Sequence, residues 1–255
     1  MLRQLRLTGF HVAEFAKVPY FVFLMVTSTL SMLAVQAIAL YAWDADPWVA
    51  WVRSAIVGMW TTTTAAAGIL GFERFKGTLV HLVTARINVF QPLTAVVSAA
   101  SLFGLLAFGV SWAAWDLVTI GSDVGHGVAP VSAGTFLLFV FLLWLACLAI
   151  SFTIAALFVL TPNAITYEEL LVVPVFILSG MLFTSTEAPA FIESLGWLIP
   201  ITEPISVLLG KTDPNGVALA AGQTLLTTAC WLVLAYFLGR VALRRARVAG
   251  TLDVI

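Results

Sequence analysis

The run from Ala133 to Leu160 contains no Asp, Glu, Lys or Arg and consists almost wholly of aliphatic and aromatic residues. A helix rises 1.5 Å per residue, so this run exceeds the roughly 20 residues that cross a hydrocarbon core of about 30 Å. Hydrophobic residues make up 61% of the chain and charged residues only 10%, whereas an ordinary soluble domain has about 25% charged residues. The sequence therefore predicts an all-α integral membrane protein.

Further apolar segments extend this pattern to six predicted transmembrane helices within one domain, residues 1–255. The spans cover about 20–43, 51–70, 92–118, 133–160, 168–183 and 217–238. Basic and apolar residues alternate through Met1–Lys17, which predicts an N-terminal amphipathic helix on the membrane surface. The run Thr61–Thr64 is followed by small residues, and this composition favours tight packing of the second span against its neighbours.

The fifth predicted span is short and contains Pro174 and Gly180, which weaken a straight helix. Two short helical segments follow it, Pro189–Leu195 and Pro204–Leu209. They are too short to cross a membrane, and the residues around them are too apolar for a free loop. We therefore expect two short re-entrant helices on the outer side, buried against protein. Three acids accompany these segments and are expected to form a solvated rim: Glu187, Glu193 and Glu203.

The basic residues are distributed unevenly among the predicted loops. With both termini in the cytoplasm, only Arg53 and Lys211 lie outside, which leaves ten of the twelve Lys and Arg residues on the cytoplasmic side. This bias satisfies the positive-inside rule and predicts a multi-pass protein of the plasma or inner membrane. The arginines after the last span, Arg240–Arg247, indicate contact with anionic membrane lipid.

The segment Gly71–Phe90 is a charged interruption between the second and third spans. Gly77 can take backbone angles closed to other residues and favours a sharp turn, and Thr78 is suited to cap the helix after it. Apolar residues then recur at helical spacing: Leu79, Leu82, Val83, Ile87 and Phe90. The opposite side of that helix holds His81, Thr84, Ala85 and Asn88. The pattern predicts a short amphipathic helix across a membrane surface.

The order Glu73-Arg74-x-x-Gly77-Thr78-Leu79 after the second span resembles the permease subunits of the type-2 exporter family of ABC transporters. In that family an E-R-x-x-G-T-L-like turn leads into a cytoplasmic coupling helix, which docks into a cleft on a separate ATPase subunit. The resemblance implies that the coupling contact consists of Glu73, Arg74, Gly77, Thr78, Leu79, Leu82 and Val83. An ordinary basic cytoplasmic loop is the alternative interpretation of this segment.

The resemblance also implies a function. The chain is expected to be the permease of an ATP-driven exporter, acting with a second identical or paralogous protomer and with ATPase subunits that bind ATP and Mg²⁺. It is then no enzyme itself and carries no cofactor, metal or catalytic residue, and it contacts membrane lipid but no nucleic acid. By the order of the helices, the family's translocation path corresponds to Thr61, Thr62, Val175 and Leu178. The apolar spans favour a hydrophobic substrate, such as a drug, an antibiotic or a lipid-like molecule.

Patterns typical of other function classes are missing from the sequence. Gly210-Lys211-Thr212 resembles the end of a phosphate-binding loop, but Ile205 stands where that motif requires glycine. Asp116 and His126 are expected to be hydrated, and the two cysteines, Cys147 and Cys230, to be buried free thiols. The spans lack the midplane acids of an ion-coupled transporter and the ligand sets of a membrane hydrolase. A six-helix secondary transporter or channel and a structural membrane-assembly protein stay open as alternatives.

Overall fold

A computed structural model describes residues 2–17, 19–75, 90–160, 168–182 and 189–249. Over these residues the protein is all-helical, and four helical stretches are long and apolar enough to cross a membrane. They are Tyr20–Trp43, Gln91–Val118, Ala133–Phe158 and Pro214–Ala242. The all-helical class and four candidate spans are thus confirmed, whereas the full set of six spans stays a prediction.

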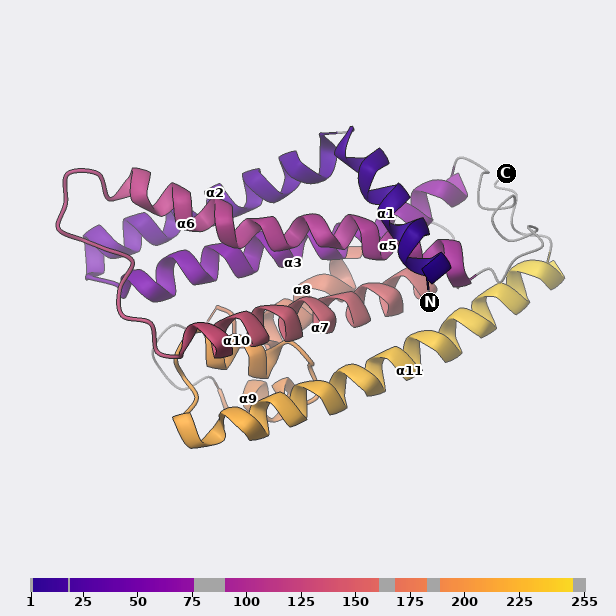
Figure 1. The fold of residues 1–255 in the computed structure, drawn as a ribbon. Helices are drawn as coiled ribbons and strands as arrows, with labels where there is room; N and C mark the ends of the chain where they lie inside the picture. The colour runs from indigo at the N-terminus through magenta and orange to yellow at the C-terminus, as the bar shows by residue number, and fades with distance from the viewer. Residues whose placement is uncertain (1, 18, 76–89, 161–167, 183–188, 250–255) are drawn as a thin grey trace.

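The helices follow the expected order along the chain (Figure 1). The helices of the bundle are α2 (Tyr20–Trp43), α3 (Pro47–Phe75), α5 (Phe90–Leu102), α6 (Leu106–Val118), α7 (Ala133–Leu160) and α11 (Val217–Ala249), with α5 and α6 following each other directly as one stretch. The remaining helices are α1 (Leu2–Ala16), α8 (Glu168–Leu178), α9 (Ala190–Gly196) and α10 (Thr202–Leu208). The described residues also include two 3₁₀ turns, η1 (Phe103–Leu105) between α5 and α6, and η3 (Pro214–Gly216) before α11.

The fifth predicted span, 168–183, ends earlier than expected. Its helix α8 has 11 residues and is about 16 Å long, roughly half the thickness of a hydrocarbon core. Ser179 still donates its backbone N–H to Val175 O, at 3.0 Å. Gly180 then adopts a φ of +72°, in the left-handed region that glycine tolerates best, and the helix stops. In the described residues α8 is therefore half a span rather than a whole one.

The central element of the bundle is α3, which packs against α2, α5, α6 and α7. Its side chains are buried almost without interruption from Trp48 to Ala67. The close approach of α3 to α2 depends on Gly58, since a Cβ at this position would lie 1.9 Å from Thr29 Oγ1 of α2. The tight packing expected for Thr61–Thr64 is confirmed, because the last three of these threonines are buried.

Hydrogen bonds between helices reinforce this packing. The Ser111 hydroxyl of α6 donates to Trp51 O of α3 at 2.6 Å, and the Ser151 hydroxyl of α7 donates to Thr63 O at 2.7 Å. Both hydroxyls are completely buried. In an apolar surrounding such bonds between helices contribute about 0.6 kcal/mol on average and up to about 1.7.

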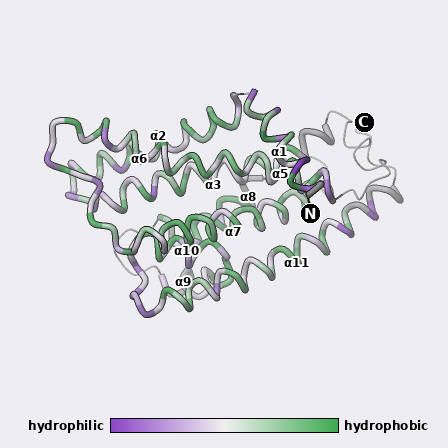
Figure 2. Tube along the Cα trace, viewed as in Figure 1, coloured by the Kyte–Doolittle hydropathy of each residue, from purple (hydrophilic) through white to green (hydrophobic). Residues whose placement is uncertain are grey.

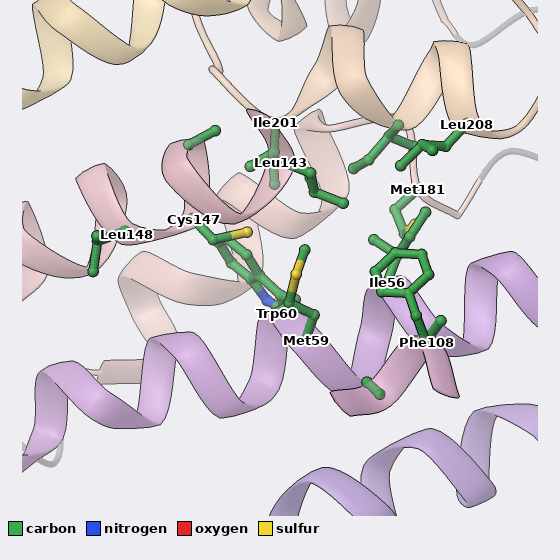
Figure 3. Packing of buried hydrophobic residues seen from close by; sticks show 14 of the residues in the cluster. Ile56, Met59, Trp60, Phe108, Leu143, Cys147, Leu148, Met181, Ile201 and Leu208 are labelled. Carbon is green, nitrogen blue, oxygen red and sulfur yellow. The ribbon is translucent and has the colours of Figure 1, made fainter. Parts of the chain in front are cut away.

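The apolar core forms where α7 and the turn after α8 meet α3 (Figure 3). Cys147 of α7 lies close to Met59 and Trp60 of α3 in this view. Met181, which follows α8, reaches the neighbourhood of Ile56 and is only 1% exposed. The short segments after α7 therefore complete the core of the bundle.

The long helices run roughly side by side, so the bundle has two ends (Figure 1). At the α1 end lie α1, the last turns of α3, α7 and α11, and the first turn of α5. Gln4 of α1 fixes this arrangement by donating its side-chain amide to Gln91 O at 3.1 Å and to Thr94 Oγ1 at 2.9 Å. At the opposite α10 end lie α10, the start of α3 and the α6–α7 loop. Hydrophilic residues concentrate toward both ends and apolar ones between them (Figure 2).

Candidate functional site

The predicted coupling segment falls mostly outside the described residues, which resume at 90 after 75. This applies to Gly77, Thr78, Leu79, Leu82 and Val83. Glu73 and Arg74 belong to the last turns of α3, at the α1 end. With 29 residues, α3 is about 43 Å long, so part of it projects beyond an apolar layer of about 30 Å. The coupling role of these residues stays a prediction.

Two of the predicted path residues lie on α3. Thr62 is completely buried, and its hydroxyl donates to Gly58 O of its own helix at 2.7 Å. Thr61 is half-buried. In this conformation the Thr62 side chain is thus enclosed within the protomer, and its hydroxyl is already used in a hydrogen bond to a backbone carbonyl.

The other two predicted path residues, Val175 and Leu178, lie on α8 and are half-buried against the core. Between them Phe176 approaches Trp60 of α3, with ring centroids 6.3 Å apart. The structure therefore places α8 against α3, the two helices from which the path residues come. Whether these residues line a path stays a prediction.

An aromatic cluster covers the α10 end of α3, and the sequence pattern did not reveal it. The Trp48 and Trp51 rings contact each other, with centroids 5.0 Å apart. Trp48 donates its indole N–H to Leu208 O of α10 at 2.9 Å, and Trp51 donates to His126 O in the α6–α7 loop at 3.1 Å. The tryptophans thus attach both α10 and the loop to the start of α3. Their enrichment near the predicted span ends was the available signal, since indoles favour membrane interfaces.

His126 is less exposed than the sequence predicts for a loop histidine. Its side chain is only 23% exposed and stacks on Trp112, with ring centroids 4.8 Å apart. Its Nε2 lies 3.1 Å from Trp112 O and 3.5 Å from Asp116 Oδ1. Asp116 itself is 56% exposed, as expected for a carboxylate near a span edge. Trp112 of α6 and Trp51 of α3 both contact the imidazole ring, and a single-sequence pattern does not contain these contacts.

Arg53 also departs from expectation. The sequence places it with the outer basic residues, but its side chain is 2% exposed in the interior of the α10 end. Its Nε and Nη2 atoms are buried and have no hydrogen-bond partner. No described carboxylate forms an ion pair with Arg53, since the described ion pairs are Lys17–Glu14 and His126–Asp116. Charge inside a predicted span was the signal that could have singled it out.

The two short helices after α8 differ in burial. α10 contributes several buried residues, Pro204, Ile205, Val207 and Leu208, whereas Phe191 and Leu195 of α9 are exposed. Glu203 in the first turn of α10 is half-buried rather than part of a solvated rim, and this burial raises the pKa of its carboxyl. Of the other expected rim acids, Glu187 and the Glu193 side chain lie outside the described part of the chain.

The two cysteines also differ in burial. Cys147 is buried as expected, but Cys230 is exposed on α11, so that half of the expectation is wrong. Both thiols are free. Within the described ranges no group of three or more His, Cys, Asp or Glu residues is arranged to hold a metal ion.

Comparisons with known proteins show no match to a family model, to a curated protein or to a solved structure.

Proposed function

We propose that the chain is the membrane-spanning permease of an ATP-driven exporter of the ABC type-2 class, with ATP hydrolysis on a separate subunit. The observation that carries the proposal is the pattern Glu73-Arg74-x-x-Gly77-Thr78-Leu79 directly after the central helix. Because α3 packs against four other helices, a displacement of its end would be passed to the whole bundle. Densely packed interiors transmit such displacements rather than absorbing them.

The distribution of charge supports an orientation with the α1 end in the cytoplasm. Arg6 lies on α1, Lys17 directly follows α1, and Arg240, Arg244 and Arg245 lie toward the end of α11. Under the positive-inside rule both termini are then cytoplasmic, and α10 and the α6–α7 loop face outward. In this proposal α8 and the segments after it form the fifth span and the outer re-entrant helices, so six spans result.

In the proposed mechanism a second protomer completes the translocation path. Closure of the ATPase pair moves the docked segments, and the two permeases shift from inward to outward access. The exposed faces of α2 and α11 are rich in large apolar side chains, which suits contact with lipid and with a partner protomer. They also favour a hydrophobic drug or lipid-like molecule as the substrate.

Copurification with the ATPase subunit tests the proposal. The chain would be coexpressed with a candidate ABC-type ATPase subunit, as wild type and as Leu82→Asp, Glu73→Ala and Thr84→Asp. Leu82→Asp places a charge in the proposed apolar contact and should weaken ATPase binding about tenfold or more. Glu73→Ala should lower export and substrate-stimulated ATP hydrolysis together. Thr84→Asp is the matched control on the opposite side of the predicted helix and should retain binding.

Full ATPase binding and full export by Leu82→Asp would show that the segment is an ordinary loop. Export by the chain without any ATPase would favour a secondary transporter or channel. Insertion of each variant into the membrane is measured first, so that loss of binding is separated from loss of folded protein.

A further inference from the structure

The last turns of α11 carry several basic residues beyond the apolar part of the helix. α11 continues to Ala249, whereas its candidate membrane span ends at Ala242. Residues 243–249 therefore extend the helix by about 10 Å past that span. Arg240, Arg244 and Arg245 are all exposed in this region, and Figure 2 shows that hydrophilic residues gather there.

The two faces of this part of α11 differ. Ala235 and Ala242 are buried and lie on the side where the helix packs against the bundle, since α11 contacts α7 and α10. Tyr236, Phe237 and Val241 are exposed on the other side. The outward face is therefore apolar before the arginines begin.

The arginines continue this outward face toward the end of the helix. Side chains four residues apart lie on the same face. Arg240 and Arg244 thus follow Tyr236 in one row, and Arg245 follows Phe237 in the neighbouring row. The Arg240 guanidinium lies over the Tyr236 ring, 5.6 Å from its centroid. One continuous exposed face thus changes from apolar to cationic.

This change occurs at the depth where a bilayer also changes. Large apolar side chains are exposed on α11 from Leu219 to Phe237. Between these two residues the helix rises about 27 Å, close to the thickness of about 30 Å of a hydrocarbon core. Arg240 lies about 4.5 Å further along the helix. The three arginines therefore begin at the level of the lipid headgroups.

The described residues supply no counter-ion for these arginines. The ion pairs in the described part of the chain are Lys17–Glu14 and His126–Asp116. Three positive charges within two helical turns repel one another unless anions neutralise them. A guanidinium is planar and suits paired hydrogen bonds to phosphate oxygens, which anionic lipids present at this depth.

We propose that Arg240, Arg244 and Arg245 form a binding site for the headgroups of anionic phospholipids in the leaflet at the α1 end. The site assigns the lipid contact expected from the sequence to one face of α11. Phe237 and Val241 adjoin the arginines on that face and would contact the acyl chains of the same lipids. This combination favours a lipid over an acidic protein surface. The site does not depend on the proposed exporter function.

The test measures the lipid composition at the two ends of α11. A fluorescent maleimide is attached to Phe237→Cys or to Leu219→Cys, each combined with Cys230→Ser. Cys147 is buried and stays unlabelled in the folded protein. Nanodiscs of phosphatidylcholine contain a minor fraction of brominated phosphatidylglycerol, whose bromines quench a probe that they contact. Quenching therefore reports the local share of the anionic lipid.

The probe at position 237 should report phosphatidylglycerol enriched at least about fivefold over its bulk share, the factor for one basic residue near an anionic surface. The probe at position 219 should report a share close to that of the bulk. Salt at about 1 M should remove the enrichment at position 237, because the Debye length then falls to about 3 Å.

Arginine variants localise the effect to this face. In the probe-bearing protein Arg244→Gln should lower the enrichment severalfold, and the triple variant Arg240→Gln, Arg244→Gln, Arg245→Gln should abolish it. Arg6→Gln is the matched control, because it removes the same charge from an exposed position on α1, and it should retain the enrichment. Membrane insertion of each variant is measured first. Should the triple variant fail to insert, Arg244→Gln and the salt dependence decide the test.

A bulk share of phosphatidylglycerol at position 237 would overturn the proposal and would leave the arginines to an acidic protein surface. Enrichment that persists in Arg244→Gln at the level of Arg6→Gln would overturn it as well, since another part of the protein would then attract the lipid. Equal enrichment at positions 219 and 237 would likewise contradict a site at this end of α11.

Discussion

The central helix α3 and the last helix α11 are both long, but they lie in opposite surroundings. α3 is enclosed by α2, α5, α6 and α7 and carries Arg53, Ser54 and a run of threonines. α11 has 33 residues and exposes large apolar side chains along its length: Leu219, Leu225, Leu226, Val233 and Phe237. The enclosed helix thus buries a charged side chain and several hydroxyl groups, whereas α11 exposes large apolar side chains.

This arrangement reverses the rule for soluble proteins, and a bilayer explains the reversal. Lipid tails are as apolar as leucine, so burying a leucine gains little and helices associate through close packing and hydrogen bonds. Small and hydroxyl-bearing residues therefore belong in the interior, where backbones approach and hydroxyls find carbonyls. In this fold Gly58 allows α2 and α3 to approach closely, and the Ser111 and Ser151 hydroxyls donate hydrogen bonds to carbonyls of α3.

The largest effect is expected from filling the contact between α2 and α3. Gly58→Leu places a side chain where even a Cβ would meet Thr29 Oγ1 at 1.9 Å and Ala107 Cβ at 3.0 Å. Overpacking of this kind should cost at least about 3 kcal/mol and prevent accumulation of folded protein. Gly222→Leu on α11 is the control, because nothing lies within 4 Å of a Cβ there. Similar yields of monodisperse protein from both variants would contradict the contrast between the helices.

A charge on the exposed face of α11 distinguishes lipid from water. Leu226 is 62% exposed, and in water Leu226→Asp would be harmless. Facing lipid, it should cost about 2.5–3.5 kcal/mol of membrane insertion. Val128→Asp, at a position 89% exposed in the α6–α7 loop, should insert normally. Glycosylation or protease mapping of insertion gives the measurement, and normal insertion of Leu226→Asp would place this face against protein or water.

Removing one hydrogen bond between helices should have a smaller effect. Ser151→Ala deletes the donor to Thr63 O of α3 and should lower stability by about 0.6–1.7 kcal/mol in a reversible unfolding assay. Ser28→Ala is the matched control, since the Ser28 hydroxyl bonds only to carbonyls of its own helix α2. Equal losses from the two variants would show that bonding between helices adds nothing here.

The smallest intervention leaves the protein unchanged and compares its two thiols. Cys230 on α11 is exposed and Cys147 on α7 is 1% exposed. A lipophilic maleimide in detergent should label Cys230 in the folded protein and Cys147 only after unfolding, because burial keeps the reagent away from the Cys147 thiol. Cys230→Ser should abolish labelling of the folded state. Early labelling of Cys147 would mean that the α3–α7 contact opens readily.

Several elements follow from local sequence alone. The helix from Ala133 to Leu160 and the helix from Tyr20 to Trp43 match their predicted bounds, because long charge-free runs have no other low-energy form in lipid. The N-terminal helix and the two short helices after α8 also occupy the stretches of sequence that periodicity and turn residues predicted to be helical. The predicted ends of the helices were less accurate, since α11 continues to Ala249, beyond the predicted end at residue 238.

The candidate site was less accessible to prediction. The E-R-x-x-G-T-L pattern can be recognised in the sequence because its residues lie within one short segment. Trp48 and Leu208 are far apart in the chain, and so are Trp51 and His126. Each of these pairs forms only when α10 or the α6–α7 loop folds over the start of α3.

The sequence by itself determined that the chain is helical and apolar enough for a membrane, and in which order its helices come. Those properties depend on composition and on spacing within one segment. The tertiary structure alone decided that α3 is central, that Cys230 is exposed and that Arg53 is enclosed. Such facts depend on which faces of different helices meet, and contacts between distant segments determine them.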